Sequence, residues 1–471
     1  MSSRHLPVVK VRTGIAGFDD LAQGGLPKGR SVLVSGSPGS GKTVFGLEFL
    51  YRGLEQGEPA VFVTFEERTG DLLTEAAGFG WDFGSFARKG LLAFVDASGI
   101  AEHQIEAGEY DFGGLISRIR HAVSKVGAKR VVIDSLASLF LRYRDNALIR
   151  RELFRIIDLL RRLGATTVIT AERVRDEDAV SRFGVEDFVA DGVIHLYHSL
   201  KGADRERQIE ILKLRGARHQ TGLHPFLIGD DGITVFPLPE QKFAEESPTK
   251  RLSTGVPGLD AMTEGGLYAS SLTLLMGPSG TGRTVLGLHF LAEGIRRRER
   301  CALFSFEESP AQLFTDAATL GWNFRSAARK RLLQVTAFSS DSAPLESFLR
   351  RMVSEIEEFR PKRVFIDSLT PLANAFSQRR FRRFVLALNA ALKRCGATTV
   401  ISHTSGAGAF AAESDMAVAA DNIIVMRFAE RGAETEREIV VVKARASDHE
   451  KDPRRYTIGK RGLRILGENG S

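Results

Sequence analysis

The sequence predicts an α/β fold of two tandem domains, each a mostly parallel sheet with helices on both faces. Three observations lead to this prediction. A series of sequence blocks occurs twice in the same order. Inside each copy, short runs rich in Val, Ile and Leu alternate with longer amphipathic stretches. A glycine-rich segment follows the first long apolar run of each copy, where a strand of such a sheet would turn into a helix.

The repeat is plain in its longest blocks. TGIAGFDDLAQGGLPKG, which starts at Thr13, recurs as TGVPGLDAMTEGGLYAS from Thr254, and SVLVSGSPGSGKTVFGLEFL recurs as LTLLMGPSGTGRTVLGLHFL. Because the blocks keep their order at a nearly constant offset, we expect two homologous domains, 1–245 and 246–471. The join should lie between Leu238 and Lys250, in a polar segment that contains prolines.

Each copy alternates predicted strands and helices. In the first copy, apolar runs predict buried strands at 31–36, 60–65, 130–135 and 166–170, and amphipathic stretches predict helices at 44–56 and 147–164. This alternation implies crossover connections and a largely parallel sheet. In such sheets, the ligand crevice lies at the carboxyl ends of the strands.

Composition excludes several classes of protein. The 471 residues are 43% hydrophobic and 26% charged, which is typical of globular chains. Two cysteines, Cys301 and Cys395, cannot frame a disulfide-built fold, and no signal peptide or long uncharged apolar segment is visible. We therefore expect a cytoplasmic protein without a membrane span. The net charge of +7 permits an anionic partner without naming one, because the basic residues are dispersed.

The first glycine-rich segment, Gly36 to Thr43, reads GSPGSGKT and fits the phosphate-loop pattern G-x-x-x-x-G-K-[ST]. Its glycines let backbone N–H groups surround a polyphosphate, and the following helix directs its positive end toward it. Lys42 would reach the β- and γ-phosphates, and Thr43 would ligate Mg²⁺. The pattern favours nucleotide binding over a plain glycine-rich turn.

The second glycine-rich segment, Gly277 to Thr284, reads GPSGTGRT and has Arg283 in place of the lysine. The charge remains, but a planar guanidinium does not reproduce a compact ammonium group. We expect nucleotide binding here with weaker hydrolysis than in the first domain. A loop retained only for packing is the alternative.

Acidic residues close two predicted strands in each domain. Asp134 and Asp367 end buried runs, where a carboxylate is costly unless it meets a cation or donors, so we expect them in the Mg²⁺ shell rather than as helix caps. The pairs Glu66-Glu67 and Glu307-Glu308 are well placed to orient and deprotonate an attacking water. Solvated surface charge is the alternative for the pairs.

Basic residues recur near the end of each copy, with two cations spaced so that they share one face of a strand. Such a pair could stabilise transition-state charge from the same chain or from a neighbouring subunit, and solvated strand charge is the alternative. The residues are Lys213, Arg215 and His219 in the first copy and Arg437, Lys443, Arg445 and His449 in the second. By contrast, His195, His198 and the cysteines show no metal-ligand spacing.

Nine segments of the first domain carry a family resemblance that is strongest there and covers nearly the whole chain. They are GFDDLAQGGLPKGR, GSPGSGKT, VFVTFEE, FGWD, RRELFR, GATTV, RFGVEDFVAD, EILKLRG and HPF. With them the chain resembles the KaiC family of tandem RecA-like ATPases, whose clock members form hexameric double rings. The resemblance implies RecA-like domains with ATP and Mg²⁺ held between adjacent subunits.

The resemblance also implies which residues form each site. In the first domain, ATP would be held by Gly39, Ser40, Gly41, Lys42, Thr43 and Val44, water would be activated by Glu66 and Glu67, and the neighbour's nucleotide would meet Lys213, Leu214, Arg215 and His219. The matching residues of the second domain are Ser279, Gly280, Thr281, Gly282, Arg283, Thr284, Val285, Glu307, Glu308, Arg437, Lys443, Arg445 and His449. Mg²⁺ would be held by Thr43, Glu66 and Asp134, and by Thr284, Glu307 and Asp367.

Two departures from the family pattern bear on activity. Clock members phosphorylate an adjacent Ser-Thr pair in their second domain, where this sequence has Ala417 and Val418, which lack a hydroxyl. The long C-terminal tail that binds the activator KaiA is missing. We therefore expect neither a KaiA-type activator nor an autokinase clock cycle, whereas ATPase activity and a homo-oligomer, most simply a hexamer, remain expected. A KaiB-like protein is a partner that the resemblance leaves open.

The leading functional hypothesis is a Mg²⁺-dependent ATPase whose first domain hydrolyses ATP slowly and whose second domain binds nucleotide in a structural or regulatory role. A phosphotransferase acting on itself or on a partner is an alternative, with Ser414, Thr404 and Ser405 as acceptors in the chain itself. A RecA-like DNA-dependent motor is a further alternative, disfavoured because no basic-aromatic stretch or DNA-binding module is visible. A scaffold whose assembly is set by ATP is the last alternative.

Overall fold

The computed structural model describes residues 8–97, 112–135, 146–173, 190–201, 204–238, 250–339, 344–405, 415–431, 434–445 and 447–466. The chain divides into two compact units, Met1–Pro237 and Leu238–Ser471. Most of the expected join between them, 239–249, lies outside the described residues. Within the described ranges, no helix has both the length and the apolar character needed to cross a bilayer.

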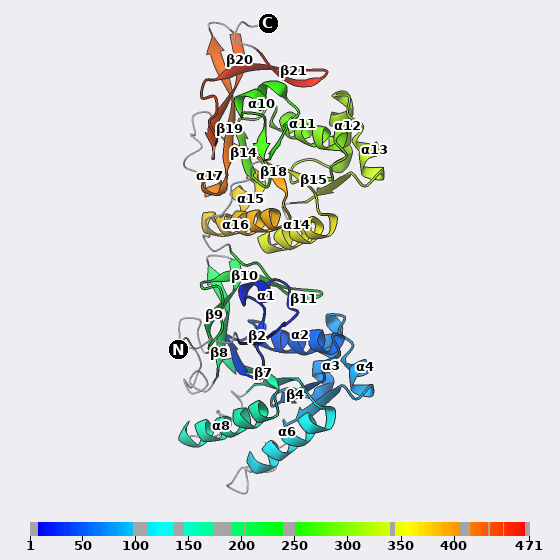
Figure 1. Ribbon diagram of the computed structural model, residues 1–471, viewed down its shortest axis with the longest axis vertical. Helices are drawn as coiled ribbons and strands as arrows, with labels where there is room; N and C mark the ends of the chain where they lie inside the picture. Colours follow the sequence, from blue (N-terminus) through cyan, green and yellow to red (C-terminus); the bar gives the residue numbers. More distant parts are fainter. Residues whose placement is uncertain are drawn as a thin grey trace, which may run out of the picture. The chain divides into compact units, whose positions relative to one another are not determined.

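The first unit is built on a nine-stranded sheet in the order β11-β10-β9-β8-β3-β7-β6-β4-β5 (Figure 1). The strands from β8 to β5 in this order are parallel, and β9, β10 and β11 add an antiparallel extension. The strands are β3 (Ser31–Gly36), β4 (Ala60–Thr64), β5 (Leu92–Asp96), β6 (Arg130–Asp134), β7 (Thr166–Glu172), β8 (Gly192–Lys201), β9 (Asp204–Leu214), β10 (His224–Gly229) and β11 (Gly232–Val235), with β1 (Lys10–Val11) and β2 (Leu26–Pro27) paired separately.

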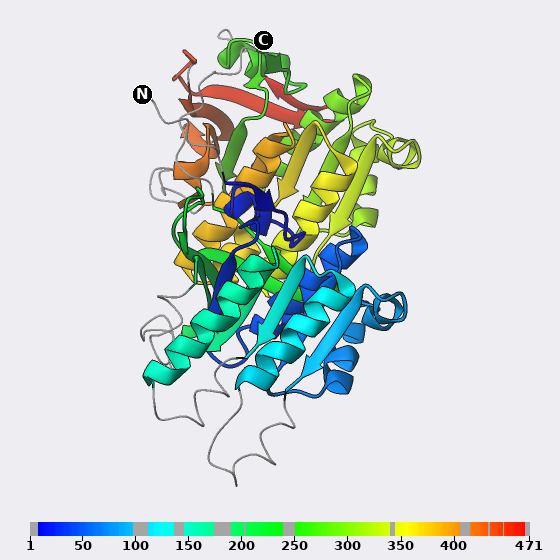
Figure 2. The same cartoon turned by 60° about the horizontal axis from the view of Figure 1, so that its bottom comes forward.

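Helices cover both faces of this sheet, which is why β3, β4 and β6 are buried along their whole length. One core joins α2 to side chains such as Val34 and Phe62, and the other joins α6 and α8 to side chains such as Val61 and Ile133. Figure 2 brings α6 and α8 to the front of the sheet. The helices are α1 (Phe18–Leu21), α2 (Lys42–Glu55), α3 (Thr69–Gly78), α4 (Phe83–Arg88), α6 (Phe112–Val126) and α8 (Asn146–Arg162).

The second unit repeats this plan with the sheet order β16-β15-β17-β18-β14-β19-β20-β21-β22. Its strands are β14 (Leu272–Gly277), β15 (Cys301–Ser305), β16 (Leu333–Ala337), β17 (Arg363–Asp367), β18 (Thr398–Thr404), β19 (Asn422–Arg431), β20 (Glu434–Ala444), β21 (Arg454–Gly459) and β22 (Gly462–Ile465), with β12 (Arg251–Leu252) and β13 (Leu267–Tyr268) paired separately. Its helices are α10 (Pro257–Met262), α11 (Arg283–Arg296), α12 (Pro310–Thr319), α13 (Phe324–Arg329), α14 (Leu345–Phe359), α15 (Thr370–Ala375), α16 (Gln378–Arg394) and α17 (Asp415–Ala419).

The predicted fold class is confirmed, since two mostly parallel sheets carry helices on both faces. The strand predicted at 31–36 has the bounds of β3, and the helix predicted at 44–56 is α2, which begins two residues earlier at Lys42. The antiparallel extension was not predicted. Its long strands carry polar residues at many positions, so the search for short apolar runs missed most of them.

Candidate nucleotide-binding sites

The first phosphate loop connects the end of β3 to the start of α2, and its glycines are required by geometry. Gly39 and Gly41 have φ values of 73° and 101°, which L side chains rarely adopt. A Cβ atom on Gly41 would lie 2.5 Å from Cδ1 of Ile228, and one on Gly36 would lie 2.4 Å from the carbonyl oxygen of Leu196. The loop therefore keeps an open cradle at the amino end of α2, where backbone N–H groups lack helical acceptors.

The cradle also holds polar groups that no described residue satisfies. The hydroxyls of Ser37 and Ser40 are buried and have no hydrogen-bond partner among the described residues. Lys42 is only 9% exposed, and its Nζ donates to the carbonyl oxygen of Ser37 at 3.1 Å. A buried cation beside orphaned hydroxyls and a positive helix end fits a polyphosphate.

Asp134 lies at the end of β6, next to the start of α2. The hydroxyls of Thr170 and Thr43 donate to its carboxylate, and Lys42 adds a positive charge nearby. Burial raises the pKa of Asp134, and the two hydrogen bonds and Lys42 act against that rise. One carboxylate and one hydroxyl beside a phosphate cradle are the protein ligands that Mg²⁺ usually takes at such sites, with phosphate oxygens and waters supplying the rest.

The glutamate pair lies at the same edge of the sheet, because Thr64 at the end of β4 pairs in register with Asp134. The Ser135 hydroxyl donates to Oε1 of Glu66 at 2.7 Å and fixes that carboxylate. Burial raises the pKa of both Glu66 and Glu67, and neighbouring carboxylates raise it further. The structure thus brings the cradle, Asp134 and the glutamate pair together.

One acidic residue of this edge was missed by the sequence analysis. Glu172 is the last residue of β7 and pairs with Gly36, the first residue of the loop. Burial lowers the pKa of Lys42, and Glu172 is the largest of the charges that oppose this effect. The predicted strand ended at Thr170, two residues too early, and a longer strand would have placed a carboxylate opposite the loop.

The second domain repeats the network with the same atoms in the same roles. The Thr284 hydroxyl donates to Oδ2 of Asp367 at 2.7 Å, and the Ser402 hydroxyl donates to its other oxygen. The Ser368 hydroxyl donates to Oε1 of Glu307 at 2.5 Å, as Ser135 does to Glu66. The two sites therefore share a common framework.

Three differences separate the second site from the first. Arg283 replaces lysine, and its Nη1 donates to the carbonyl oxygen of Gly277 at 2.5 Å. Thr404 pairs with Gly277 where Glu172 pairs with Gly36, so this position of the second site has a hydroxyl in place of the carboxylate. The third difference is at Glu308, which matches Glu67 of the first site: burial, together with Asp316 and Asp367, raises the pKa of Glu308 to about 7.

The basic pairs lie at the opposite, amino edge of their own sheets. The Arg215 N–H donates to the Asp191 carbonyl, and the Asp191 N–H donates to Ser31. Since Ser31 begins β3 and Gly36 ends it, about 17 Å of strand separate Arg215 from its own phosphate loop. In the second domain, the same chain of bonds places Arg445 level with Leu272. Arg215 and Arg445 therefore lie at the edge of the sheet opposite the loop of their own domain.

The two histidines predicted beside these pairs have an unsatisfied atom. His219 and His449 each have a buried Nδ1 with no hydrogen-bond partner in the described part of the chain. Lys443 donates to the carbonyl oxygens of Ala417 and Ala420 at 3.2 and 2.7 Å. Ala417 is buried, and the side chain of Val418 lies outside the described residues.

Arg437 is placed differently from the cluster with which it was predicted. Its Nε donates to the carbonyl oxygen of Gly280, in the phosphate loop of its own domain, at 3.4 Å. Arg207 makes the matching contact with Gly39 at 3.4 Å in the first domain and was missed by the sequence analysis. A strand pairing explains both positions, since Arg207 lies opposite His198 and Arg437 lies opposite Phe428, near the carboxyl edge.

Comparison with known proteins shows which family the whole chain resembles. The family model described as "ATPase: KaiC" matches residues 11–240 and 252–470. The chain is 42% identical over 466 residues to the circadian clock oscillator protein KaiC of Synechococcus elongatus, covering 98% of this chain and 90% of that protein. It is 42% identical over 463 residues to the KaiC of Acaryochloris marina, covering 97% and 88%, and 40% identical over 467 residues to that of Prochlorococcus marinus, covering 98% and 94%.

Proposed function

The chain belongs to the KaiC family of ATPases, and on that premise we propose that it hydrolyses ATP to ADP and phosphate mainly in its first domain. The observation that carries this proposal is the contrast between the two sites. The first joins Lys42, Glu172 and Asp134 at one loop, whereas the second has Arg283 and Thr404 at the matching positions. A site that keeps both the compact cation and its carboxylate neighbour is better suited to phosphoryl transfer.

In the proposed reaction, the loop 36–41 and the amino end of α2 bind the triphosphate through backbone N–H groups. Lys42 leaves the Ser37 carbonyl and neutralises charge on the β- and γ-phosphates. Thr43 and Asp134 would hold Mg²⁺, which would supply positive charge against the triphosphate. Their mutual hydrogen bond orients both ligands before the nucleotide arrives.

The glutamate pair activates the attacking water. The water oxygen forms a bond to the γ-phosphorus, the bond from that phosphorus to the β–γ bridging oxygen breaks, and ADP leaves with the bonding electrons. One water proton passes to a carboxylate of the pair, that of Glu66 or that of Glu67, and the other proton stays on the phosphate that forms. Because the pKa of both carboxylates is raised, each is a stronger base than an unperturbed glutamate.

A ring of identical chains would complete each site. Arg215 lies about 17 Å of strand from its own loop, and Lys213, which is level with Leu33, lies about 10 Å from it. These distances support a role on nucleotide bound to another copy. The unsatisfied Nδ1 of His219 lies in the same part of the chain. We propose a cytoplasmic homo-oligomer, most simply a hexamer, with nucleotide in the second domain serving assembly or regulation and a KaiB-like protein as a partner.

ATP turnover by the full chain tests the division of labour. We expect Lys42→Ala and the double variant Glu66→Gln/Glu67→Gln to lower turnover by about 100-fold or more. The matched control Glu307→Gln/Glu308→Gln should change turnover by less than about twofold, because it alters the same pair in the second domain. Equal losses in the two double variants, or none in either, would refute the proposal.

Phosphotransfer to the chain itself is a second candidate, because hydroxyl side chains flank the second loop. Thr404 pairs with Gly277, and the Ser405 N–H donates to the Gly277 carbonyl at 3.2 Å. Ser414, the third predicted acceptor, lies outside the described residues. Incubation with labelled ATP and phosphosite mapping decides this question: label on Thr404 or Ser405 supports transfer, and an unlabelled chain excludes it.

A further inference from the structure

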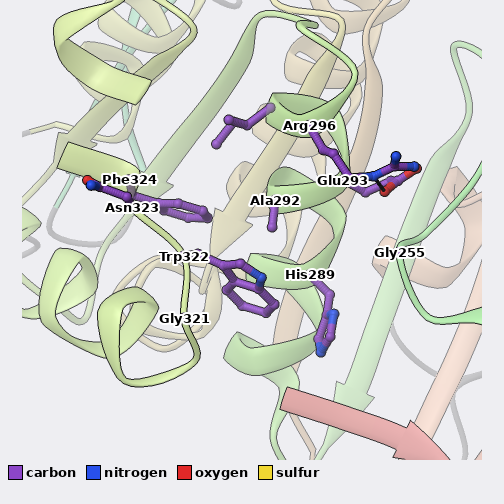
Figure 3. A pocket seen from close by; sticks show the side chains of 10 residues that line it. Gly255, His289, Ala292, Glu293, Arg296, Gly321, Trp322, Asn323 and Phe324 are labelled. Carbon is purple, nitrogen blue, oxygen red and sulfur yellow. Dashed lines mark hydrogen bonds and ion pairs between the residues drawn. The ribbon is translucent and has the colours of Figure 1, made fainter. Parts of the chain in front are cut away.

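A cavity of about 310 Å³ lies in the second domain, between α11 and the turn that joins α12 to α13 (Figure 3). Its lining includes His289, Ala292 and Glu293 from α11, and Trp322 and Phe324 from the turn and the start of α13. Ala292 projects from α11 toward the two aromatic residues (Figure 3). The volume is at the lower end of the range for small-molecule pockets.

In the first domain, a tyrosine side chain fills the space that corresponds to this pocket. The repeated helix reads GLEFLYRG in the first domain and GLHFLAEG in the second, so Tyr51 stands where Ala292 does. The Tyr51 ring stacks on Trp81, with ring centres 5.7 Å apart and planes 23° apart. The edges of Phe83 and Phe86 complete its surroundings at 5.7 and 6.0 Å. One aromatic ring therefore closes the first domain at this position.

The second domain keeps the matching tryptophan but lacks the ring that covers it. Trp322 stacks on Phe324 at 6.2 Å and meets the edge of the His289 ring at 4.6 Å. Among the residues that the structure describes, no ring occupies the place of Tyr51, because Ala292 contributes only a methyl group. Trp81 is 3% exposed, whereas Trp322 remains partly exposed. A ring-sized space thus adjoins an aromatic wall.

The polar walls of the cavity are already engaged. Nε2 of His289 accepts from the Leu463 N–H at 2.8 Å, and the ring also bonds to the Gly255 backbone, which fixes it as a neutral imidazole. The Glu293 carboxylate accepts from Arg296 at 2.8 Å and from Arg297 at 2.5 Å. Stacking on Trp322, rather than hydrogen bonding to these groups, is the interaction the pocket offers.

We propose that this cavity is a binding site for a small planar aromatic molecule, whose ring takes the place of Tyr51 and stacks on Trp322. The site is separate from the phosphate loop, since no residue from 277 to 284 lines it. The helical rise places Ala292 about 12 Å along α11 from Thr284. The inference therefore does not depend on where ATP is hydrolysed.

The test uses the full chain with phenol as the probe and cyclohexanol as a non-aromatic probe of similar size. Trp81→Phe leaves Trp322 as the sole tryptophan, because the chain has two, so its fluorescence reports the pocket. We expect phenol to shift this fluorescence saturably and to bind at least about tenfold more tightly than cyclohexanol. Equal binding of the two probes, or no saturable binding of phenol, would overturn the proposal.

Filling the pocket provides the matched variant. Ala292→Tyr recreates the arrangement of the first domain, so phenol affinity should fall by at least about tenfold while ATP turnover stays unchanged. Should Ala292→Tyr fail to fold, Ala292→Leu blocks the same space with a smaller side chain and the same expectation. Unaltered phenol binding in the folded variant, or loss of phenol binding on adding ATP to the wild-type chain, would assign the probe to another place and refute the inference.

Discussion

One position of the repeat predicts that the stabilities of the two domains depend on pH in opposite directions. Glu48 in α2 and His289 in α11 occupy this position, and each accepts a hydrogen bond from the backbone of the strand below, Ile233 N–H at 2.7 Å and Leu463 N–H at 2.8 Å. Both side chains are buried, at 1% and 8% exposure. Burial disfavours the charged form of each, which is the anion in one domain and the cation in the other.

The direction of each effect follows from its pKa. Burial raises the pKa of Glu48 from 4.5 to about 7 in spite of Arg52 at 3.3 Å, so its contribution to stability is present below pH 4.5 and is lost as pH rises through 7. Burial lowers the pKa of His289 from 6.5 to about 4, so its contribution is present above pH 6.5 and is lost as pH falls through 4. At 1.36 kcal/mol per unit, acidification from pH 8 to pH 5 stabilises the first domain by about 2.5 kcal/mol and destabilises the second by about 2 kcal/mol.

Glutamine at either position removes the titration and keeps an acceptor for the backbone N–H. We expect Glu48→Gln to abolish the gain in stability of the first domain on acidification, and His289→Gln to abolish the loss of stability of the second. Each domain has one tryptophan, so urea unfolding is followed through Trp81 in Trp322→Phe and through Trp322 in Trp81→Phe. At both pH values, the free energy of unfolding of each glutamine variant is subtracted from that of its parent. The contributions of the other titrating groups cancel in this difference. Parent and variant curves that move in parallel with pH would show that these two groups do not carry the effect.

Three further predictions concern the phosphate loops. Ser135→Ala removes the 2.7 Å hydrogen bond that fixes Glu66. ATP turnover should therefore fall about tenfold, while ATP affinity, measured by equilibrium binding, stays unchanged. An unchanged turnover would contradict the role of Ser135 in positioning Glu66. Gly41→Ala places a Cβ 2.5 Å from Ile228 in a residue with φ of 101°, and we expect the ATP affinity of the first domain to fall about tenfold or more. Gly57→Ala is the control for backbone strain alone, because its φ is 77° and its Cβ meets nothing within 4 Å. Equal ATP affinities in the two variants would count against the cradle. Arg283→Lys combined with Thr404→Glu gives the second site the lysine and carboxylate of the first. In the Glu66→Gln/Glu67→Gln background, where hydrolysis in the first domain is removed, ATP turnover should rise about tenfold. No rise would show that other differences keep the second site inactive.

Local pattern was enough to predict the framework of each domain. Burial on both faces makes a parallel strand a continuous apolar run, so β3, β4, β6 and the helix after the loop could be recognised without knowing their neighbours. The same locality explains why Asp134 and Glu66 could be proposed together, since carboxyl ends of parallel strands meet at one edge. The roles of these residues in catalysis remain predictions.

Features that depend on which strands pair could not be obtained in this way. Glu172 faces the loop because β7 pairs with β3 in one register, and Arg437 lies at its own loop because β20 pairs with β19 in another. The position of Lys213 and Arg215 at the far edge follows from the same kind of pairing. A strand's apolar pattern fixes its faces but not its partner, and the partner sets which distant residues meet.

The sequence by itself determined the duplicated α/β plan, the two phosphate loops and the family, because each is written in contiguous residues. Tertiary structure alone decided that Ser135 holds Glu66, that Arg215 and Arg445 lie at the sheet edge opposite their own loops, and that Ala292 leaves a cavity beside Trp322. The physical reason is that a hydrogen bond or a void is defined by atoms brought together from separate segments, and their packing depends on the register and spacing of the whole domain.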